Sequence, residues 1–376
     1  MTKYYSLDYL DDNYSHSRYN MIFGERSNGK TFAVLERILK KWIYDGEKGA
    51  YIRRLDNDIK GDKAKRVWTA LTDRNSTDLV TKYTNGEWTD VVFRSRAWYL
   101  AKFDDKLNKY VSQPEPFCYA FALNVAEGYK STSYPGVTTI LFDEFLSRNR
   151  YLRDEFVEYQ NVLSTIIRQR NNVKVYMLGN TVNMYSPYFD EMGVDISDMQ
   201  PGHVKEIELK GKDESLFIAA QYCKPNVDGK ASDVYFQFGN RKLKMITDGA
   251  WEIPMYPHRP IEILPKDIVE IFFIDFIEKD AIVQGEIVAK DDNIFLYLHR
   301  KTTPIKDPDT KMVYRLNPSP KLNHAVSLTG PAFRNKISAL IGRLIKEGQI
   351  YYQDNNIGEL VRYYQEQAGY SLTDLA

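Results

Sequence analysis

The chain has 376 residues, of which 43% are apolar and 14% aromatic, so it is not a disordered chain and has enough material for two folded domains. Its 51 Lys and Arg residues balance 51 Asp and Glu residues, which excludes the strongly basic composition of many nucleic-acid-binding proteins. The two cysteines, Cys118 and Cys223, lie far apart, which excludes a disulfide scaffold or structural zinc site and fits a reducing cytosol.

The first motif is Gly24-Glu25-Arg26-Ser27-Asn28-Gly29-Lys30-Thr31, which has the form G-x-x-x-x-G-K-T. A short, largely apolar run precedes it, and apolar residues follow at helical spacing until Asp45-Gly46. A glycine loop between a strand and a helix directs backbone N–H groups and a helix N-terminus at a phosphate chain. We therefore predict that this loop binds a nucleotide, with Lys30 at the β- and γ-phosphates and Thr31 on Mg²⁺.

The segment after the first helix leaves two interpretations open. A strand is predicted over 49–52, and the pair Arg53-Arg54 at its end either senses phosphate or DNA or forms a solvated strand end. The segment 57–71 is predicted to be a helix, and its basic residues form either a solvated face or the lining of a DNA pore. These residues are Lys60, Lys63, Lys65 and Arg66. A hairpin is predicted where the runs 79–84 and 88–93 flank Asn85-Gly86.

The second strong motif is Asp143-Glu144 at the end of the apolar run 137–142, which is typical of a buried parallel strand. Asp143 is expected to bind the Mg²⁺ shell, and Glu144 to polarise the attacking water as a general base. A glutamate directly after this aspartate indicates the additional-strand, catalytic-glutamate class of ATPases. The sequence contains no Asn-Lys-x-Asp motif, which is the motif that recognises guanine, and this favours ATP as the nucleotide.

Polar residues follow the next helix and the next strand. A helix is predicted over 153–170, and it ends in Arg168-Gln169-Arg170. These arginines suit an arginine finger donated across a subunit interface, although capping of the helix C-terminus comfortably accounts for one of them. The strand predicted over 173–178 ends in Gly179-Asn180, so Asn180 is a candidate sensor of the γ-phosphate or the water.

Together these motifs resemble the genome-packaging (DNA-encapsidation) ATPases of small short-tailed phages of Gram-positive hosts. The resemblance covers about residues 15–190, and the family is similar to FtsK/HerA-type translocases and large terminases. It rests, in chain order, on the phosphate loop, Tyr51-Ile52-Arg53-Arg54, Lys130-Ser131 with Tyr134-Pro135, residues 139–145, Arg168-Gln169-Arg170, Gly179-Asn180, Asn183 and Pro187-Tyr188-Phe189.

The resemblance implies a homo-oligomeric ring, usually of five subunits, docked on the portal (connector) of an empty prohead. Such a ring drives double-stranded DNA into the capsid with ATP and Mg²⁺. By resemblance, Arg168 is the finger supplied in trans, Arg170 is the second candidate, and Lys130 reaches the nucleotide of the neighbouring subunit. In some members a structural RNA joins the motor to the portal, and whether one is needed here stays open.

We predict an α/β P-loop ATPase domain with a mostly parallel sheet over residues 1–200. A linker region over residues 201–265 is predicted to follow it. Within it, the runs 204–209 and 216–222 alternate like strands, and prolines crowd near its end. Three strand-like runs over 268–300 and two helices then predict an α+β domain over 266–376. Strands followed by helices resemble the RNase H-type nuclease domain of larger packaging motors.

In the resembling family this domain has lost its metal site and binds DNA, RNA or the portal, so we expect no cleavage here. The acids that favour the alternative of an active nuclease are Asp275, Glu286, Asp291 and Asp292. A third reading is a nucleotide-gated assembly or secretion protein, against which Glu144 argues because a binding switch needs no general base.

The first twenty residues are polar and tyrosine-rich, and no apolar run reaches about 18 residues. We therefore expect no signal peptide and no membrane span. The expected location is the host cytoplasm, with transient binding at the portal vertex of the prohead.

Overall fold

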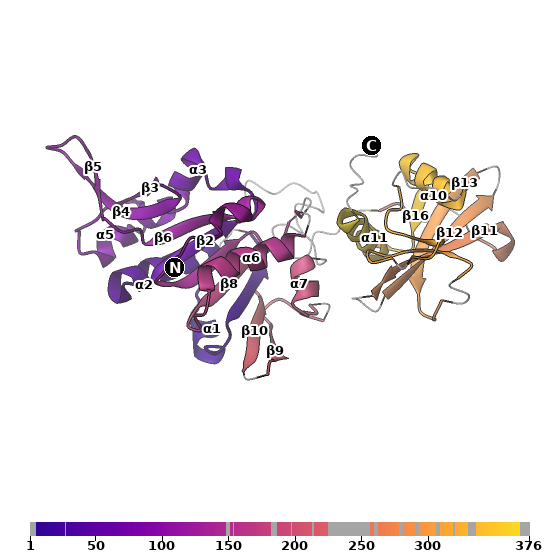
Figure 1. Ribbon diagram of the computed structural model, residues 1–376, viewed down its shortest axis with the longest axis horizontal. Coiled ribbons are helices and arrows are strands. Elements are labelled where there is room, and N and C mark those ends of the chain that lie inside the picture. Colours follow the sequence, from indigo (N-terminus) through magenta and orange to yellow (C-terminus); the bar gives the residue numbers. More distant parts are fainter. Residues whose placement is uncertain are drawn as a thin grey trace. The chain divides into compact units, whose positions relative to one another are not determined.

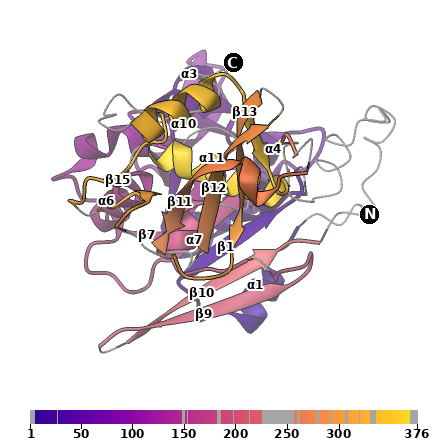
Figure 2. The same cartoon turned by 90° about the vertical axis from the view of Figure 1, so that its right-hand side faces the viewer.

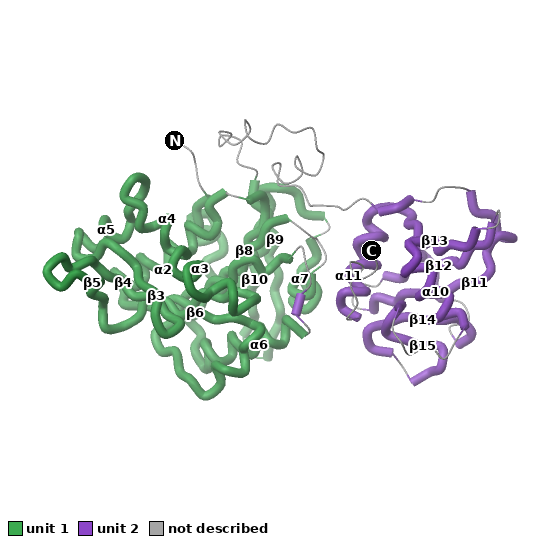
Figure 3. The backbone as a smooth tube through the Cα atoms, turned by 90° about the horizontal axis from the view of Figure 1, so that it is seen from above, with its two compact units in different colours: residues 1–148, 154–252 green, residues 149–153, 253–376 purple. Residues whose placement is uncertain are grey.

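The computed structural model divides the chain into two compact units, which Figure 3 distinguishes by colour. The first contains residues 1–148 and 154–252, and the second contains residues 149–153 and 253–376. The described residues are 5–26, 28–147, 151–152, 154–181, 186–196, 198–212, 214–224, 256–258, 262–277, 281–290, 293–305, 309–318, 320–329 and 336–368.

The first unit is built on a ten-stranded, mostly parallel sheet with the order β3-β4-β6-β2-β7-β8-β1-β10-β9, in which β5 pairs with β4 (Figure 1). The parallel strands are β6 (Cys118–Ala122), β2 (Lys48–Arg53), β7 (Val137–Asp143), β8 (Lys174–Asn180), β1 (Tyr19–Gly24) and β10 (Ser215–Tyr222). Antiparallel strands flank them: β3 (Asp90–Arg94), β4 (Ala97–Asp104), β5 (Lys109–Ser112) and β9 (Val204–Lys210). The predicted α/β fold with a mostly parallel sheet is confirmed.

Strand β8 separates the strand that precedes the glycine loop from the strand that ends at Asp143. It pairs in parallel with β1 on one side and with β7 on the other. In this register Asn180 lies opposite Gly24, and Leu178 lies opposite Asp143. The carboxyl ends of the three strands therefore meet at one edge of the sheet, which is where ligands of parallel α/β sheets bind.

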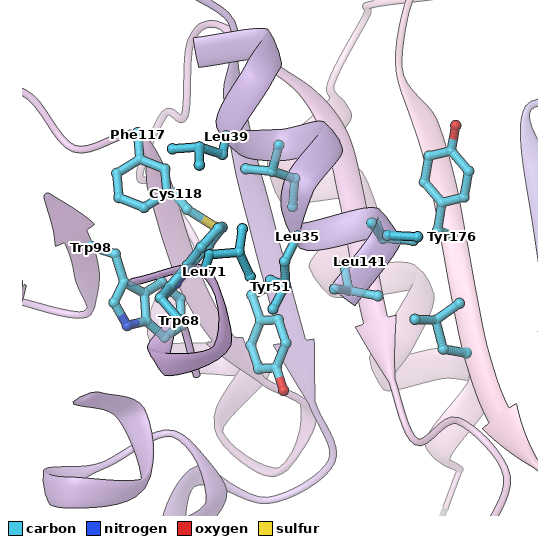
Figure 4. Packing of buried hydrophobic residues seen from close by; sticks show 14 of the residues in the cluster. Leu35, Leu39, Tyr51, Trp68, Leu71, Trp98, Phe117, Cys118, Leu141 and Tyr176 are labelled. Carbon is cyan, nitrogen blue, oxygen red and sulfur yellow. The ribbon is translucent and has the colours of Figure 1, made fainter. Parts of the chain in front are cut away.

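The core of this unit lies where α2 (Lys30–Asp45) packs on the sheet. Figure 4 shows Leu35 and Leu39 of α2 between the side chains of the strands, and both are fully or almost fully buried. Burial of one such leucine contributes roughly 1.5–3 kcal/mol. Gly49 allows the close approach, because a Cβ there would lie 2.4 Å from Ile38.

The remaining helices of the first unit are short, except for α6. They are α1 (Asp8–Asn13), α3 (Gly61–Arg66), α4 (Thr69–Thr72), α5 (Leu79–Tyr83), α6 (Glu155–Ile167) and α7 (Pro187–Glu191), with 3₁₀ helices η1 (Asp56–Asp58) and η2 (Leu123–Tyr129). Across the described part of the chain, no helix combines the length and the apolar composition that spanning a membrane requires.

The single helix predicted over 57–71 is wrong, because η1, α3 and α4 divide this segment. The break places Trp68 against Phe117, with 4.7 Å between ring centroids. It also leaves the backbone oxygen of Ala64 to accept a hydrogen bond from Trp98 Nε1 at 2.8 Å. Figure 4 shows the three aromatic side chains gathered beside Cys118. Burial of these rings outweighs the helical propensity of the segment.

The hairpin predicted around Asn85-Gly86 is also wrong, because residues 79–83 form helix α5. Asn85 and Gly86 have φ angles of 50° and 82°, and the Gly86 N–H donates to the backbone oxygen of Thr81. This pair therefore ends a helix. Residues with positive φ angles are common at helix ends as well as in hairpin turns. The hairpin joins β3 to β4 instead, and its turn is Ser95-Arg96.

Strands β9 and β10 lie at the two strand-like runs predicted at 204–209 and 216–222 within the linker region. They pair with each other, and β10 pairs with β1, so they extend the main sheet (Figure 2). Ile218, Ala219 and Ala220 are fully buried on β10, which explains why this segment joins the core. Most of residues 225–261 lie outside the described residues, and the predicted domain bounds at 200 and 265 stay predictions.

The second unit contains the predicted β-meander, which is confirmed, in a six-stranded sheet of order β15-β14-β11-β12-β13-β16. Its strands are β11 (Ile268–Phe276), β12 (Ala281–Lys290), β13 (Asn293–Lys301), β14 (Met312–Tyr314), β15 (His324–Ala325) and β16 (Ile350–Tyr352). The 3₁₀ helix η4 (Pro265–Asp267) precedes them, and the helices α10 (Lys336–Lys346) and α11 (Asn355–Gln367) follow most of them.

An ion pair on this sheet predicts a pH-dependent stability. The hydrogen bond that His299 Nε2 donates to Glu286 Oε1, at 3.2 Å, raises the pKa of His299 above its ordinary 6.5. The stabilisation is therefore complete below about pH 6.5 and is lost as the pH rises through the folded-state pKa. We expect the wild-type melting temperature to exceed that of a His299→Asn variant by about 2 °C at pH 6, with a smaller difference at pH 8.5. A difference that does not depend on pH would contradict this assignment.

Candidate functional site

The glycine loop has the geometry of an anion-binding site. Gly29 has a φ of 91° and precedes α2, so backbone N–H groups at the helix start turn toward the loop. The Lys30 side chain is buried, and its Nζ donates to the backbone oxygen of Glu25 at 2.6 Å. Burial lowers the pKa of Lys30, although the charges of Glu25 and Asp143 oppose this effect. Ser27, predicted to contact the nucleotide, lies outside the described residues.

Thr31 and Asp143 lie together at the mouth of the loop. The Thr31 hydroxyl donates to Asp143 Oδ1 at 3.2 Å, and the Tyr51 hydroxyl donates to Oδ2 at 2.9 Å. Burial raises the pKa of Asp143, while Arg53 and the bond from Tyr51 work in the opposite direction. A hydroxyl beside a carboxylate is a ligand pair that Mg²⁺ accepts, so these residues fit the predicted metal.

Arg53 connects the two acids. Its Nη2 lies 2.6 Å from Glu144 Oε2, and its Nη1 lies 3.3 Å from Asp143 Oδ2. Burial disfavours its charge, but the Tyr51 hydroxyl and the negative charges of Asp143 and Glu144 outweigh burial and hold the pKa of Arg53 above its usual value. The Glu144 side chain is 56% exposed and can leave this pair without breaking a packed core. Arg53 is therefore part of the site and not a solvated strand end.

A cavity of about 300 Å³ joins these groups and extends to Asn180. Its lining consists of Arg26, Lys30, Thr31, Asp143, Glu144, Leu178, Gly179 and Asn180. Asn180 thus lines the same cavity as both acids, and its role as a sensor stays a prediction. A larger cleft of about 500 Å³ runs along α2, but neither Asp143 nor Glu144 lines it.

Arg168 lies at the opposite edge of the sheet, between the end of α6 and the start of β8. Arg168 is exposed and donates to the backbone oxygen of Thr132 at 2.7 Å, while Lys130 is exposed and pairs with Glu127. The loop that contains Thr132 leads into Val137, which is the first residue of β7. Asp143 is the last residue of the same strand. Seven residues of strand span roughly 20 Å. Arg168 therefore lies about one strand length from Asp143 of its own chain.

Arg170 binds its own chain much more extensively than Arg168 does. Its guanidinium donates to the backbone oxygens of Val137 at 2.6 Å, of Ile167 and Tyr134 at 3.2 Å each, and of Ile166. Those bonds occupy the donors that a finger needs, so the geometry favours helix capping for Arg170.

The difference between the two arginines predicts a difference in stability. Arg170→Ala removes charge-assisted bonds to carbonyls and should cost about 2–4 kcal/mol, or about 5–10 °C in melting temperature. Arg168→Ala removes one exposed bond and should cost less than about 1 kcal/mol. Thermal unfolding of both variants measures this directly. An unchanged melting temperature with lost ATP turnover in the Arg170 variant would make Arg170 the finger.

The sequence matches one protein family over about half of its length. Residues 4–198 match the family described as the Podovirus DNA encapsidation protein (Gp16). The chain belongs to this family. Within it, the chain is 28% identical to the DNA packaging protein of Bacillus phage B103 over 178 residues, and to that of Bacillus phage phi29 over 173 residues.

These alignments cover 46% and 45% of this encapsidation-family chain, and they span about half of the relatives, at 48% and 45% of their lengths. Two solved structures share its fold over almost the whole chain. The phi-28 gp11 DNA packaging motor has a TM-score of 0.54 at 18% identity and covers 98% of both chains. The bacteriophage phi-29 viral genome packaging motor assembly has a TM-score of 0.53 at 18% identity, covering 96% and 99%.

In this family member, the sequence assigns no role to Tyr51 or Glu155, and it leaves two interpretations open for Arg54. Tyr51 binds Asp143, and Arg54 binds the backbone after Asp143 and the carboxylate of Glu155. Their signal was the run Tyr51-Ile52-Arg53-Arg54, in which polar side chains end an apolar strand. The partner of Arg54, Glu155, carried no signal at all, because it reads as an ordinary first-turn acid of a helix.

Proposed function

We propose that this protein is an ATP hydrolase of the additional-strand, catalytic-glutamate class that translocates double-stranded DNA and packages a viral genome. The observation that carries the proposal is the gathering of Lys30, Thr31, Asp143 and Glu144 around one cavity. The position of β8 between β1 and β7 supports the class, and membership of the encapsidation family supports the substrate.

The chain's own residues suit ATP hydrolysis. Lys30 and the loop amides bind the phosphates, and Thr31 and Asp143 hold Mg²⁺, which neutralises phosphate charge when bound. Glu144 orients a water for in-line attack on the γ-phosphorus and accepts its proton as the bond to ADP breaks. For this the Glu144 carboxylate has to leave Arg53, so the pair at 2.6 Å is a resting arrangement.

A neighbouring subunit completes the site. Arg168 stabilises the charge of the transition state in trans, and Lys130 approaches the same nucleotide. Five subunits close a ring around DNA, which the pore contacts through its phosphates without reading sequence. The ring acts at the portal vertex of the prohead in the host cytoplasm, with a packaging RNA as an optional partner.

The second unit is proposed to bind nucleic acid or portal without cutting DNA. Its order β13-β12-β11-β14-β15, with β14 and β15 parallel to β11, supports an RNase H-like ancestry. Asp275 pairs with Arg315, and Glu286 pairs with His299. Among the described residues, no three His, Cys, Asp or Glu side chains gather as a metal site. Asp291 and Asp292 lie outside them.

The test is ATP turnover of the purified full chain with and without double-stranded DNA, together with its oligomeric mass. We expect DNA to stimulate turnover, a ring-sized particle to form, and Lys30→Ala to abolish turnover. Turnover that DNA does not change would favour a nucleotide-gated scaffold. Mg²⁺-dependent DNA cleavage that Asp275→Ala abolishes would favour an active nuclease.

A further inference from the structure

Arg54 is the first residue after β2, and its side chain lies against the backbone that follows Asp143. The proposed hydrolysis of ATP assigns no role to it. Its Nη1 donates to the backbone oxygen of Glu144 at 3.2 Å, and its Nη2 donates to that of Phe145 at 2.8 Å. Its Nε donates to Glu155 Oε2 at 2.8 Å. One planar guanidinium thus joins the end of β2, the residues after β7 and the first residue of α6.

Glu155 is a fixed anchor for this guanidinium. Its side chain is 0% exposed, and its other oxygen, Oε1, accepts a hydrogen bond from the Tyr188 hydroxyl at 2.6 Å. The Tyr188 ring is buried and packs edge-on against Phe145, with 5.8 Å between centroids. A buried carboxylate bonded at both oxygens resists movement, because displacement would leave its charge uncompensated.

Glu144 needs such support. Its φ of 61° is uncommon for a residue with a side chain, so its backbone does not hold this conformation by itself. Phe145 is fixed on the far side, since its N–H donates to the backbone oxygen of Leu178 at 3.0 Å. Hydrogen bonds from Arg54, and the bond between Phe145 and Leu178, therefore fix the backbone at Glu144. The exposed carboxylate of Glu144 can still move between Arg53 and the cavity.

We propose that Arg54 is a positioning residue for ATP hydrolysis, which holds the backbone of Glu144 so that its carboxylate reaches the attacking water. The proposal rests on the proposed function, because it assumes that Glu144 is the general base. Arg54 does not line the cavity around Lys30 and Asp143, and it donates to the backbone of Glu144 and Phe145, so we infer that it acts through Glu144. The competing explanation is that Arg54 only neutralises buried Glu155.

A charge-neutral double variant of the full chain separates the two explanations. Arg54→Gln alone leaves Glu155 buried and unpaired, so both melting temperature and turnover should fall. Arg54→Gln combined with Glu155→Gln removes both charges and should restore the melting temperature and keep ATP affinity within about threefold. Its DNA-stimulated kcat should still be about 10- to 100-fold below wild type. The reason is that the guanidinium that bonds the backbone oxygens of both Glu144 and Phe145 is gone.

Arg54→Lys provides an independent measurement. It keeps a charge beside Glu155, but a single ammonium does not reproduce the fork that reaches two carbonyls and a carboxylate. We expect a nearly wild-type melting temperature and ATP affinity with a reduced kcat. A wild-type kcat in either the folded double variant or the Arg54→Lys variant would overturn the proposal. Failure of the proposed function looks different, because wild-type protein would then show no ATP turnover that Lys30→Ala abolishes.

Discussion

A Glu144→Gln variant is expected to bind ATP with affinity within about threefold of wild type and to hydrolyse it about 10²- to 10⁴-fold more slowly. The amide keeps the shape of the side chain and still accepts a hydrogen bond from Arg53, which lies 2.6 Å from Oε2. It does not accept the proton of the attacking water. The loss should therefore appear in kcat, with little change in stability because the side chain is exposed.

Glu87→Gln is the matched control, because Glu87 is also an exposed glutamate but lies in the segment before β3, outside the cavity lining. Its turnover should equal that of wild type. Equal turnover of Glu144→Gln and wild type would remove the general-base assignment. A loss of ATP binding in Glu144→Gln would instead place this carboxylate among the binding groups.

Arg168→Ala is expected to lower DNA-stimulated turnover by about 10³-fold, within the range that arginine fingers contribute. ATP binding should persist, because Arg168 lies at the edge of the sheet opposite the glycine loop of its own chain, where its guanidinium donates to the backbone oxygen of Thr132. The effect requires assembled subunits. Basal turnover of a dilute monomer should therefore change much less than turnover in the presence of DNA.

Arg94→Ala is the control for this variant. Arg94 is an exposed arginine that also donates to one backbone oxygen, that of Gln113. It is the last residue of β3, which lies at one end of the strand order of the sheet. Its removal should leave DNA-stimulated turnover unchanged. If both variants lost turnover equally, the effect would reflect loss of positive surface charge and not a finger.

The local parts of the site were predictable from sequence because their signals are local. The glycine loop with its flanking strand and helix, and the acids Asp143 and Glu144 after an apolar strand, each occupy one continuous stretch. Helix α2 ends at Gly46, which has a φ of 69°, where the sequence predicted its end.

The remaining parts depend on contacts between distant segments. Trp68 and Phe117 are far apart in the chain, and their packing divides a segment whose composition favours one helix. Arg54 meets Glu155 across 101 positions only because β2 and β7 are neighbours in the sheet. No periodicity or spacing in the sequence encodes that register, so these partners appear only in the fold.

Mixing two inactive variants tests the shared active site most directly. Equal amounts of Glu144→Gln and Arg168→Ala subunits form some interfaces in which an intact Glu144 faces an intact Arg168 from its neighbour. If subunits mix at random and sites act independently, DNA-stimulated turnover should recover to about a quarter of wild type. If the arginine acted within its own subunit, no site would contain both groups, and a mixture as inactive as its components would contradict the account.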